Sequence, residues 1–268
     1  MKKLNICIVT KLTNGLFYNC VKSIKEKTLK DTLDNMMISV CYTCDNPSDV
    51  KSISDFLAYE IKLPYKIIQM PYNYAKCNNS LSKLTNLTDY LLLLNDDVML
   101  IDDCITHCIK VLDSDKDHKF GSVGVKLLYS NKTIQHAGQM LVISSNNNDF
   151  IGVTHYCLKH SDISLPDYVS FGNTGAFMMI RLSDFDECGG FNEKYIHCFE
   201  DVELNMNLLS KGLLNITCGS VSAYHLESQT RHQELSHEDI HMMVDFYNRN
   251  KDLILQNKDI LTRTIIER

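Results

Sequence analysis

Residues 90–100 read YLLLLNDDVML, an apolar run that ends at Asn95, Asp96 and Asp97. Consecutive leucines are typical of a strand that is covered on both faces of a sheet. Ionised carboxylates are costly to bury unless a partner compensates their charge. Either this strand ends at the surface, or its two acids meet a cation at its carboxyl end.

Two other places in the chain carry side chains that could do chemistry. Glu200 and Asp201 open a helix-like segment, and His225 ends the last strand-like run. By themselves, acids in a first helical turn complement the helix dipole, and a histidine at a strand end is usually structural. The residues alone leave both roles open.

The elements that must position these residues alternate in the first half of the chain. Apolar periodicity predicts strands at 4–10, 36–44, 66–70 and 90–95. It predicts helices at 15–27, 48–60 and 80–89. Such alternation predicts an α/β fold with a mostly parallel central sheet flanked by helices. Ligands of these sheets sit beyond the carboxyl ends of the strands, which is where Asp45, Asp96 and Asp97 fall.

The second half is less regular. It predicts strands at 121–129, 175–181 and 221–225, a helix at 200–212, and loops at 144–150 and 155–170. Ser236 to Asp239 resembles a capping box that opens a C-terminal helix. The chain shows no internal repeat and no Pro/Gly/Ser-rich linker, so a single domain over residues 1–268 is expected.

Composition narrows the class of protein. A net charge of −6 argues against a nucleic-acid partner, and no apolar stretch is long enough to span a membrane. Eleven cysteines and no signal-peptide pattern predict free thiols in a reducing, cytoplasmic setting. Cys41 with Cys44, and Cys104 with His107 and Cys108, lack a second ligand pair at zinc-finger spacing. Buried thiols are therefore a better interpretation of both patterns than structural zinc.

From about residue 5 to about residue 250, the order of motifs resembles glycosyltransferase family 2, the nucleotide-sugar enzymes with the GT-A fold. DNPSD at 45–49 is similar to the family's acidic turn at the nucleobase, PYNYAKCNNSLSK at 71–83 to its nucleotide-site segment, and LLLLNDDV to its metal-binding motif. VKLLYSNKTIQHAG at 125–138 resembles the bacterial polysaccharide, rhamnosyltransferase-like branch. NTGAFMMIR, GGFNEKYIHCFEDVELNMNLLSKG and YHLES then follow in the family's order.

The resemblance implies a metal-dependent inverting glycosyltransferase. Its nucleotide-binding half spans about 1–100, its acceptor-binding half about 101–230, and a C-terminal helical segment about 234–268. The donor is a nucleoside-diphosphate sugar, with UDP- or dTDP-sugars favoured. The acceptor is a hydroxyl group of a glycan, free or attached to a lipid or a protein.

The same resemblance implies the site residues. It places donor contacts at Thr10, Asp45, Asn73, Asn79, Asn95, Asp96 and Gly175. Asp97 and His225 are the expected ligands of Mn²⁺ or Mg²⁺, and Mn²⁺ accepts an imidazole more readily. Asn95 departs from the family's Asp-x-Asp pattern, because its amide accepts a hydrogen bond but brings no charge.

The expected general base is Asp201, the second acid of its pair, which would take the proton of the acceptor hydroxyl. Gly175 has two compatible interpretations, a backbone requirement and a close approach to the donor sugar. Asn95 favours an alternative function, a non-catalytic nucleotide- or glycan-binding module of the same fold. Nucleotidyltransferases are disfavoured, because VTKLTNGLFYN after the first strand has one glycine and no glycine-rich basic loop.

Overall fold

The structure is a computed structural model that describes residues 2–85, 87–144, 150–157, 165–195, 198–226 and 237–256. Its main sheet is ordered β10-β12-β6-β11-β4-β1-β2-β3, with β5 paired to β12 and β7 paired to β6. The strands are β1 (Leu4–Thr10), β2 (Met36–Tyr42), β3 (Tyr65–Gln69), β4 (Tyr90–Asn95), β5 (Val98–Leu100), β6 (Phe120–Leu128), β7 (Ile134–His136), β10 (Asp167–Ser170), β11 (Phe177–Arg181) and β12 (Leu214–His225).

Most strands of the main sheet run in one direction. β1 is parallel to β2 and β4, β2 to β3, and β12 to β6. β11 is antiparallel to both β4 and β6, so β6 and β12 run the same way as β4. The carboxyl ends of β1, β2, β3, β4, β6 and β12 therefore share one edge of the sheet.

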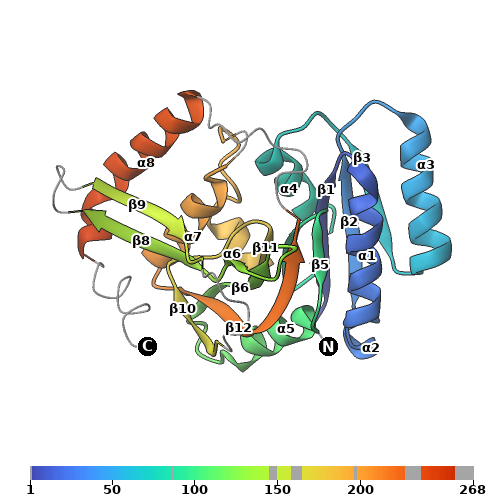
Figure 1. Ribbon diagram of the computed structural model, residues 1–268, viewed down its shortest axis with the longest axis horizontal. Coiled ribbons are helices and arrows are strands. Elements are labelled where there is room, and N and C mark those ends of the chain that lie inside the picture. Colours follow the sequence, from blue (N-terminus) through green and yellow to red (C-terminus); the bar gives the residue numbers. More distant parts are fainter. Residues whose placement is uncertain are drawn as a thin grey trace.

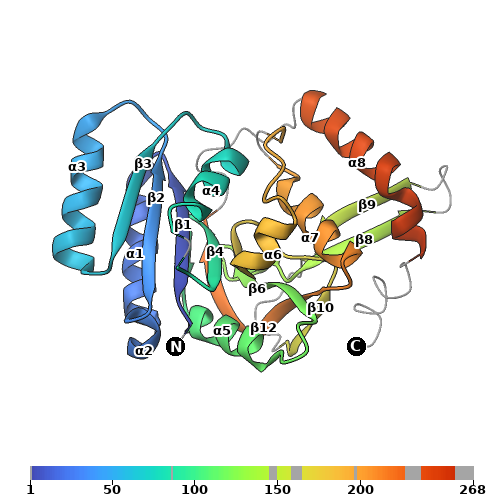
Figure 2. The same ribbon diagram turned by 180° about the vertical axis from the view of Figure 1, so that it is seen from behind.

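Helices cover both faces of this sheet. They are α1 (Leu16–Lys27), α2 (Lys30–Leu33), α3 (Pro47–Asp55), α4 (Tyr74–Ser82), α5 (Cys104–Ser114), α6 (Leu182–Glu187), α7 (Glu200–Ser210) and α8 (His237–Gln256), with a 3-10 turn at Thr13–Gly15 and a π-helix at Phe56–Ile61. α1 lies in front of the strands in Figure 1, and α4 and α6 lie in front of them in Figure 2.

The leucine run of β4 shows why both faces are apolar. Leu92 and Leu94 belong to the core shared with α1, α3 and α5, whereas Leu91 and Leu93 belong to the core shared with α4, α6 and α7. Alternate residues of a strand point to opposite faces, so a strand between two helical layers needs no polar side. The predicted α/β class is confirmed.

A smaller hairpin stands beside the main sheet. β8 (Gln139–Ser144) and β9 (Phe150–His155) pair antiparallel, and α8 lies next to them in both views (Figures 1 and 2). The backbone N–H of Val153 donates to the hydroxyl of Tyr247 at 2.7 Å. Phe246, fully buried, packs with Phe199 of the segment before α7. The hairpin and α8 thus cover the region from which α7 starts.

Three predicted segments need correction. The helix expected at 80–89 is wrong: α4 begins at Tyr74 because Asn73 caps it by accepting from the N–H of Lys76 at 2.8 Å, and it ends at Ser82. The loop expected at 155–170 contains β10, whose edge position needs no strong apolar pattern. The last strand begins at Leu214, not at 221. Ser236 of the expected capping box lies outside the described residues.

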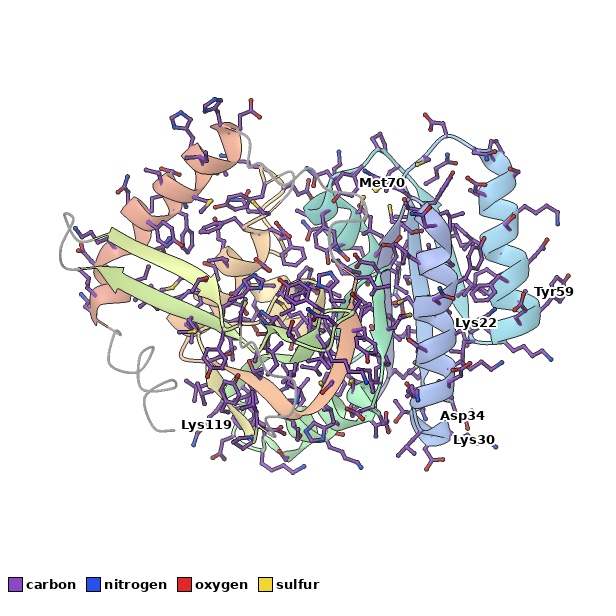
Figure 3. All side chains as sticks on the ribbon, viewed as in Figure 1. Lys22, Lys30, Asp34, Tyr59, Met70 and Lys119 are labelled. Atoms are coloured by element: carbon purple, nitrogen blue, oxygen red, sulfur yellow. The ribbon has the colours of Figure 1, made fainter. Side chains whose placement is uncertain are left out.

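The sheet has two distinct ends. Figure 3 shows Met70, which follows β3, at the end opposite to Lys30 and Asp34. Met70 therefore marks the carboxyl edge. Within the described residues, no helix has the length and apolar character that a membrane crossing requires.

Candidate active site

The carboxyl edge brings together the ends of β1, β4 and β12. β4 ends at Asn95, and β5 pairs with β12 so that Val98 lies opposite His225. The backbone N–H of Leu226 donates to the carbonyl of Asp97 at 3.0 Å. This register holds Asp97 beside His225, which are 128 positions apart in the sequence (225 − 97).

Asp97 and His225 converge without a hydrogen bond. Nε2 of His225 lies 3.2 Å from Oδ1 of Asp97, and the two side chains are only 10% and 13% exposed. Oδ1 of Asp97 is nevertheless a buried oxygen with no hydrogen-bond partner. A buried acceptor left unsatisfied is costly, and a divalent cation held between the two side chains would satisfy it.

Gln135 fixes the imidazole of His225. Nδ1 of His225 lies 2.7 Å from Oε1 of Gln135, and Nε2 of Gln135 donates to the carbonyl of His225 at 3.5 Å. Because an amide carbonyl oxygen only accepts, Nδ1 donates to it, and Nε2 is the ring nitrogen that would bind a metal. Metal-binding histidines are commonly oriented in this way by a second hydrogen bond. The residues therefore fit a divalent cation.

Asn95 lies next to this pair. Its Nδ2 lies 3.4 Å from Nε2 of His225, so the amide makes a long hydrogen-bond contact with that ring nitrogen. Its backbone N–H donates to the carbonyl of Ala176 at 3.0 Å, which ties the end of β4 to the loop before β11.

Asp96 points toward β1. The hydroxyl of Thr10 donates to Oδ2 of Asp96 at 2.6 Å and itself accepts from the N–H of Leu12 at 2.9 Å. Burial raises the pKa of Asp96 to about 6; the Thr10 hydrogen bond opposes the rise, and the charge of Asp97 adds to it. The two predicted donor-site residues are thus in direct contact.

Asp201 occupies the start of α7, where Phe199 has a left-handed φ of 81°. Its Oδ2 accepts from the N–H of Gly175 at 2.9 Å, and its Oδ1 accepts from the N–H of Val202 at 2.7 Å. Tyr74 donates its hydroxyl to the carbonyl of Gly175 at 2.7 Å. The carboxylate is therefore fixed against the loop that also contacts Asn95.

A buried polar network holds that loop in place. Asn173 donates to Oγ of Ser122 at 3.0 Å and to the carbonyl of Ile216 at 3.1 Å, while Asn205 donates to the carbonyl of Asn173 at 2.7 Å. A side chain on Gly124 would place its Cβ 2.3 Å from Oδ1 of Asn173. The NTGAF segment is thus anchored to β6, α7 and β12.

Asp45 is exposed and follows β2 at the same edge of the sheet. The acid next along the chain, Asp49, accepts from the hydroxyl of Tyr42 at 2.5 Å. A nucleobase contact by Asp45 stays a prediction.

Asn73 and Asn79 join α4 to the segment after α6. Asn73 donates to the carbonyl of Glu193 at 3.1 Å. Asn79 donates to the carbonyl of Phe191 at 2.8 Å and accepts from its N–H at 2.9 Å. These bonds give both asparagines a positioning role, and their contact with a donor stays a prediction.

Sequence reasoning missed Gln135, although it lies inside the quoted segment at 125–138. It also missed Lys11, whose ammonium group lies 4.2 Å from the ring centre of Tyr72 beside the carboxyl ends of β1 and β3. No local signal identifies either residue, because each acts through a partner distant in the sequence.

No family model matches the chain. Over 121 residues it is 32% identical to the O-antigen biosynthesis protein RfbC of Myxococcus xanthus, a match that covers 41% of this chain and 9% of RfbC.

Solved structures cover nearly the whole chain. GalNAc-T7, crystallised with UDP, GalNAc and Mn²⁺, matches with a TM-score of 0.71 at 12% identity over 92% of this chain and 48% of its own. S. aureus TarS 1–349 in complex with UDP-GlcNAc matches at 0.62 and 13% identity, over 91% and 65%. The mannosyltransferase PcManGT from Pyrobaculum calidifontis, with GDP-Man and Mn²⁺, matches at 0.59 and 10% identity, over 85% and 58%.

The chain therefore has the GT-A fold, which confirms the fold implied by the resemblance in its sequence. The similarity to these solved structures shows the fold of this chain and nothing about its activity. The chain spans less than two thirds of the length of each of these proteins, from 9% of RfbC to 65% of the TarS chain.

Proposed function

We propose that this chain is a metal-dependent inverting glycosyltransferase that uses a nucleoside-diphosphate sugar, with UDP- or dTDP-sugars favoured. The observation that carries the proposal is the buried Oδ1 of Asp97, which accepts no hydrogen bond and lies 3.2 Å from the oriented Nε2 of His225. Such an arrangement suits a bound cation, and it lies at the carboxyl edge where α/β sheets bind their ligands. UDP, UDP-GlcNAc and GDP-Man in the structural relatives support a donor of this class.

Asp97 and His225 would hold Mn²⁺ or Mg²⁺. The bound cation supplies Lewis acidity to the departing diphosphate, which a chain of net charge −6 is otherwise poorly equipped to stabilise. Asp96, which accepts from the hydroxyl of Thr10, would orient the donor's ribose. Asp45 lies beyond β2 at the same edge, on the side proposed for the base.

Asp201 would act on the acceptor. As the acceptor oxygen bonds to the anomeric carbon, the bond from that carbon to the diphosphate oxygen breaks, and its electron pair leaves with the diphosphate. The acceptor's proton passes to the Asp201 carboxylate. The N–H groups of Gly175 and Val202 keep that carboxylate in one orientation, and each of its oxygens retains a further lone pair for the proton.

The acceptor is proposed to be a hydroxyl group of a surface polysaccharide or of its lipid- or protein-linked precursor. The support is the RfbC match, since that protein's name refers to O-antigen biosynthesis.

The test is Asp201→Asn, assayed for sugar transfer and, separately, for nucleotide binding. We expect transfer to fall by about 10²–10⁴-fold, the usual contribution of a general base, with nucleotide affinity unchanged. The anomeric configuration of the wild-type product, read by NMR, tests inversion. A mutant as active as wild type would remove Asp201 from the mechanism. The matched control is Glu203→Gln, in the same first turn, where Glu203 accepts from Tyr195 instead of facing Gly175.

One observation favours a second function, a non-catalytic nucleotide-binding module. Asn95 brings no charge and places its amide 3.4 Å from the metal-facing nitrogen of His225. This alternative predicts nucleotide binding that EDTA does not change, together with no transfer to any acceptor.

A further inference from the structure

Three potential metal ligands on α5 have no place in the proposed reaction. Cys104, His107 and Cys108 lie within one turn and a half of this helix, and their spacing lacks a second ligand pair in the sequence. The fold supplies the missing partners from two strands that are more than 50 residues away along the chain, Asp167 on β10 and Cys218 on β12 (167 − 107 = 60).

Strand register places two of the ligands together. Asp167 and Cys218 are direct partners in the antiparallel β10–β12 ladder. Directly opposite residues of such a ladder have neighbouring Cβ atoms and share one face of the sheet. α5 packs on that face, and His107 Nε2 lies 2.6 Å from Oδ2 of Asp167.

The three side chains form a compact donor set. Nε2 of His107, a carboxylate oxygen of Asp167 and Sγ of Cys218 all lie within 4.8 Å of one another. Cys218 is fully buried beneath the other two, whose side chains are 31% and 28% exposed. The set is thus open to solvent on one side and closed by a thiol on the other.

Surrounding groups orient these ligands. The hydroxyl of Ser220 donates to Oδ1 of Asp167 at 2.7 Å, which leaves Oδ2 directed at His107. Metal sites commonly have their ligands oriented by such outer hydrogen bonds.

We propose that His107, Asp167 and Cys218 bind a Zn²⁺-class cation that joins α5 to β10 and β12. One nitrogen, one oxygen and one sulfur ligand suit a borderline-soft ion, and a water completes the tetrahedron. On binding, the proton of the Cys218 thiol leaves to solvent and the thiolate bonds to the metal. Cys218 pairs with Val125 of β6 and Tyr224 pairs with Leu128, three positions further along β6 (128 − 125), which is roughly 10 Å of strand. The site is therefore separate from Asp97 and independent of the proposed transfer.

The test is a Co²⁺ titration of the chelator-treated, reduced chain, monitored by the thiolate-to-cobalt charge-transfer absorption in the near ultraviolet. Wild type should develop this absorption with one equivalent of Co²⁺ and lose it when Zn²⁺ displaces the cobalt. Cys218→Ser should abolish the absorption. His107→Gln should weaken Zn²⁺ binding, measured by competition with a chromogenic chelator, by at least about tenfold, the lower bound for losing even an outer-shell partner.

Two controls separate this site from others. Cys188→Ser removes a half-buried thiol elsewhere and should leave the absorption intact. Asp97→Asn should also leave it intact, so failure of the proposed transferase site cannot mimic failure of this one. Circular dichroism checks that each variant is folded. If Cys218→Ser does not fold, the Zn²⁺ affinity of His107→Gln, a change at a partly exposed residue, decides whether the site exists. The proposal would be overturned if wild type showed no thiolate absorption, or if the absorption persisted in Cys218→Ser. His107 and Asp167 would then form an ion pair without a metal.

Discussion

Replacing Gln135 by methionine should weaken Mn²⁺ binding, although Gln135 itself contacts no metal. The substitution keeps the volume of the side chain but removes the oxygen that accepts from Nδ1 of His225 at 2.7 Å. In the metal-bound state Nε2 must keep its lone pair, so the hydrogen stays on Nδ1 and is buried without a partner. That penalty is about 1–3 kcal/mol.

The metal-free variant can avoid the penalty. Its imidazole can carry the hydrogen on Nε2 instead, 3.2 Å from Oδ1 of Asp97. The cost therefore falls on the bound state, and it corresponds to an affinity loss of about 10–100-fold, in line with other outer-shell partners of metal ligands.

The assay is titration calorimetry of Mn²⁺ into the metal-free protein, with Gln135→Glu as the matched variant. A glutamate still accepts from Nδ1, so its affinity should equal or exceed that of wild type. Wild-type affinity in the folded methionine variant would refute the reasoning. An equal loss in both variants would assign Gln135 a packing role.

Two further predictions concern the metal-free protein in EDTA. The free energy of unfolding should fall by up to about 3 kcal/mol as pH rises from about 4 to about 7, because folded Asp96, with its pKa near 6, keeps a proton that the unfolded chain has lost. Asp96→Asn should flatten this dependence in urea titrations, and an unchanged slope would contradict it. Gly124→Ala should destabilise the fold by about 1–3 kcal/mol, because its Cβ would lie 2.3 Å from Oδ1 of Asn173. An unchanged denaturation midpoint would show that the Asn173 network can move aside.

The parts of the fold that the sequence predicts well are those in which one local pattern decides the structure. ICIV in β1 and YLLLL in β4 are continuous apolar runs because helices cover both faces of these strands. The helix at Leu16–Lys27 is predicted because Phe17, Val21 and Ile24 recur on one face, and all three are fully buried. The acids after β4 are likewise visible, since polar residues interrupt an apolar run at the strand's end.

Other features depend on partners that no local pattern reveals. The apolar spacing of Leu81 and Leu84 favours a helix over 80–89, but the Asn73 cap starts α4 earlier and Leu87 is exposed. β10 is an edge strand with a mixed pattern.

The contacts of the candidate sites are also set by tertiary structure. Gln135 reaches His225, and Asp167 faces Cys218, only through the register of strands far apart in the sequence. A motif can therefore identify His225 but not the residue that orients it.

The most direct test of the central claim is a binding panel of UDP, dTDP and GDP with Mn²⁺, Mg²⁺ or EDTA, run on wild type and on Asp97→Asn. A ligand at 100 times its dissociation constant stabilises a protein by about 2.7 kcal/mol, which is a thermal shift of several degrees for a chain of this size. We expect such a shift in wild type for one nucleotide base, dependent on the metal and lost in Asp97→Asn. An equal shift in EDTA, or in Asp97→Asn, would contradict a metal site at Asp97 and His225.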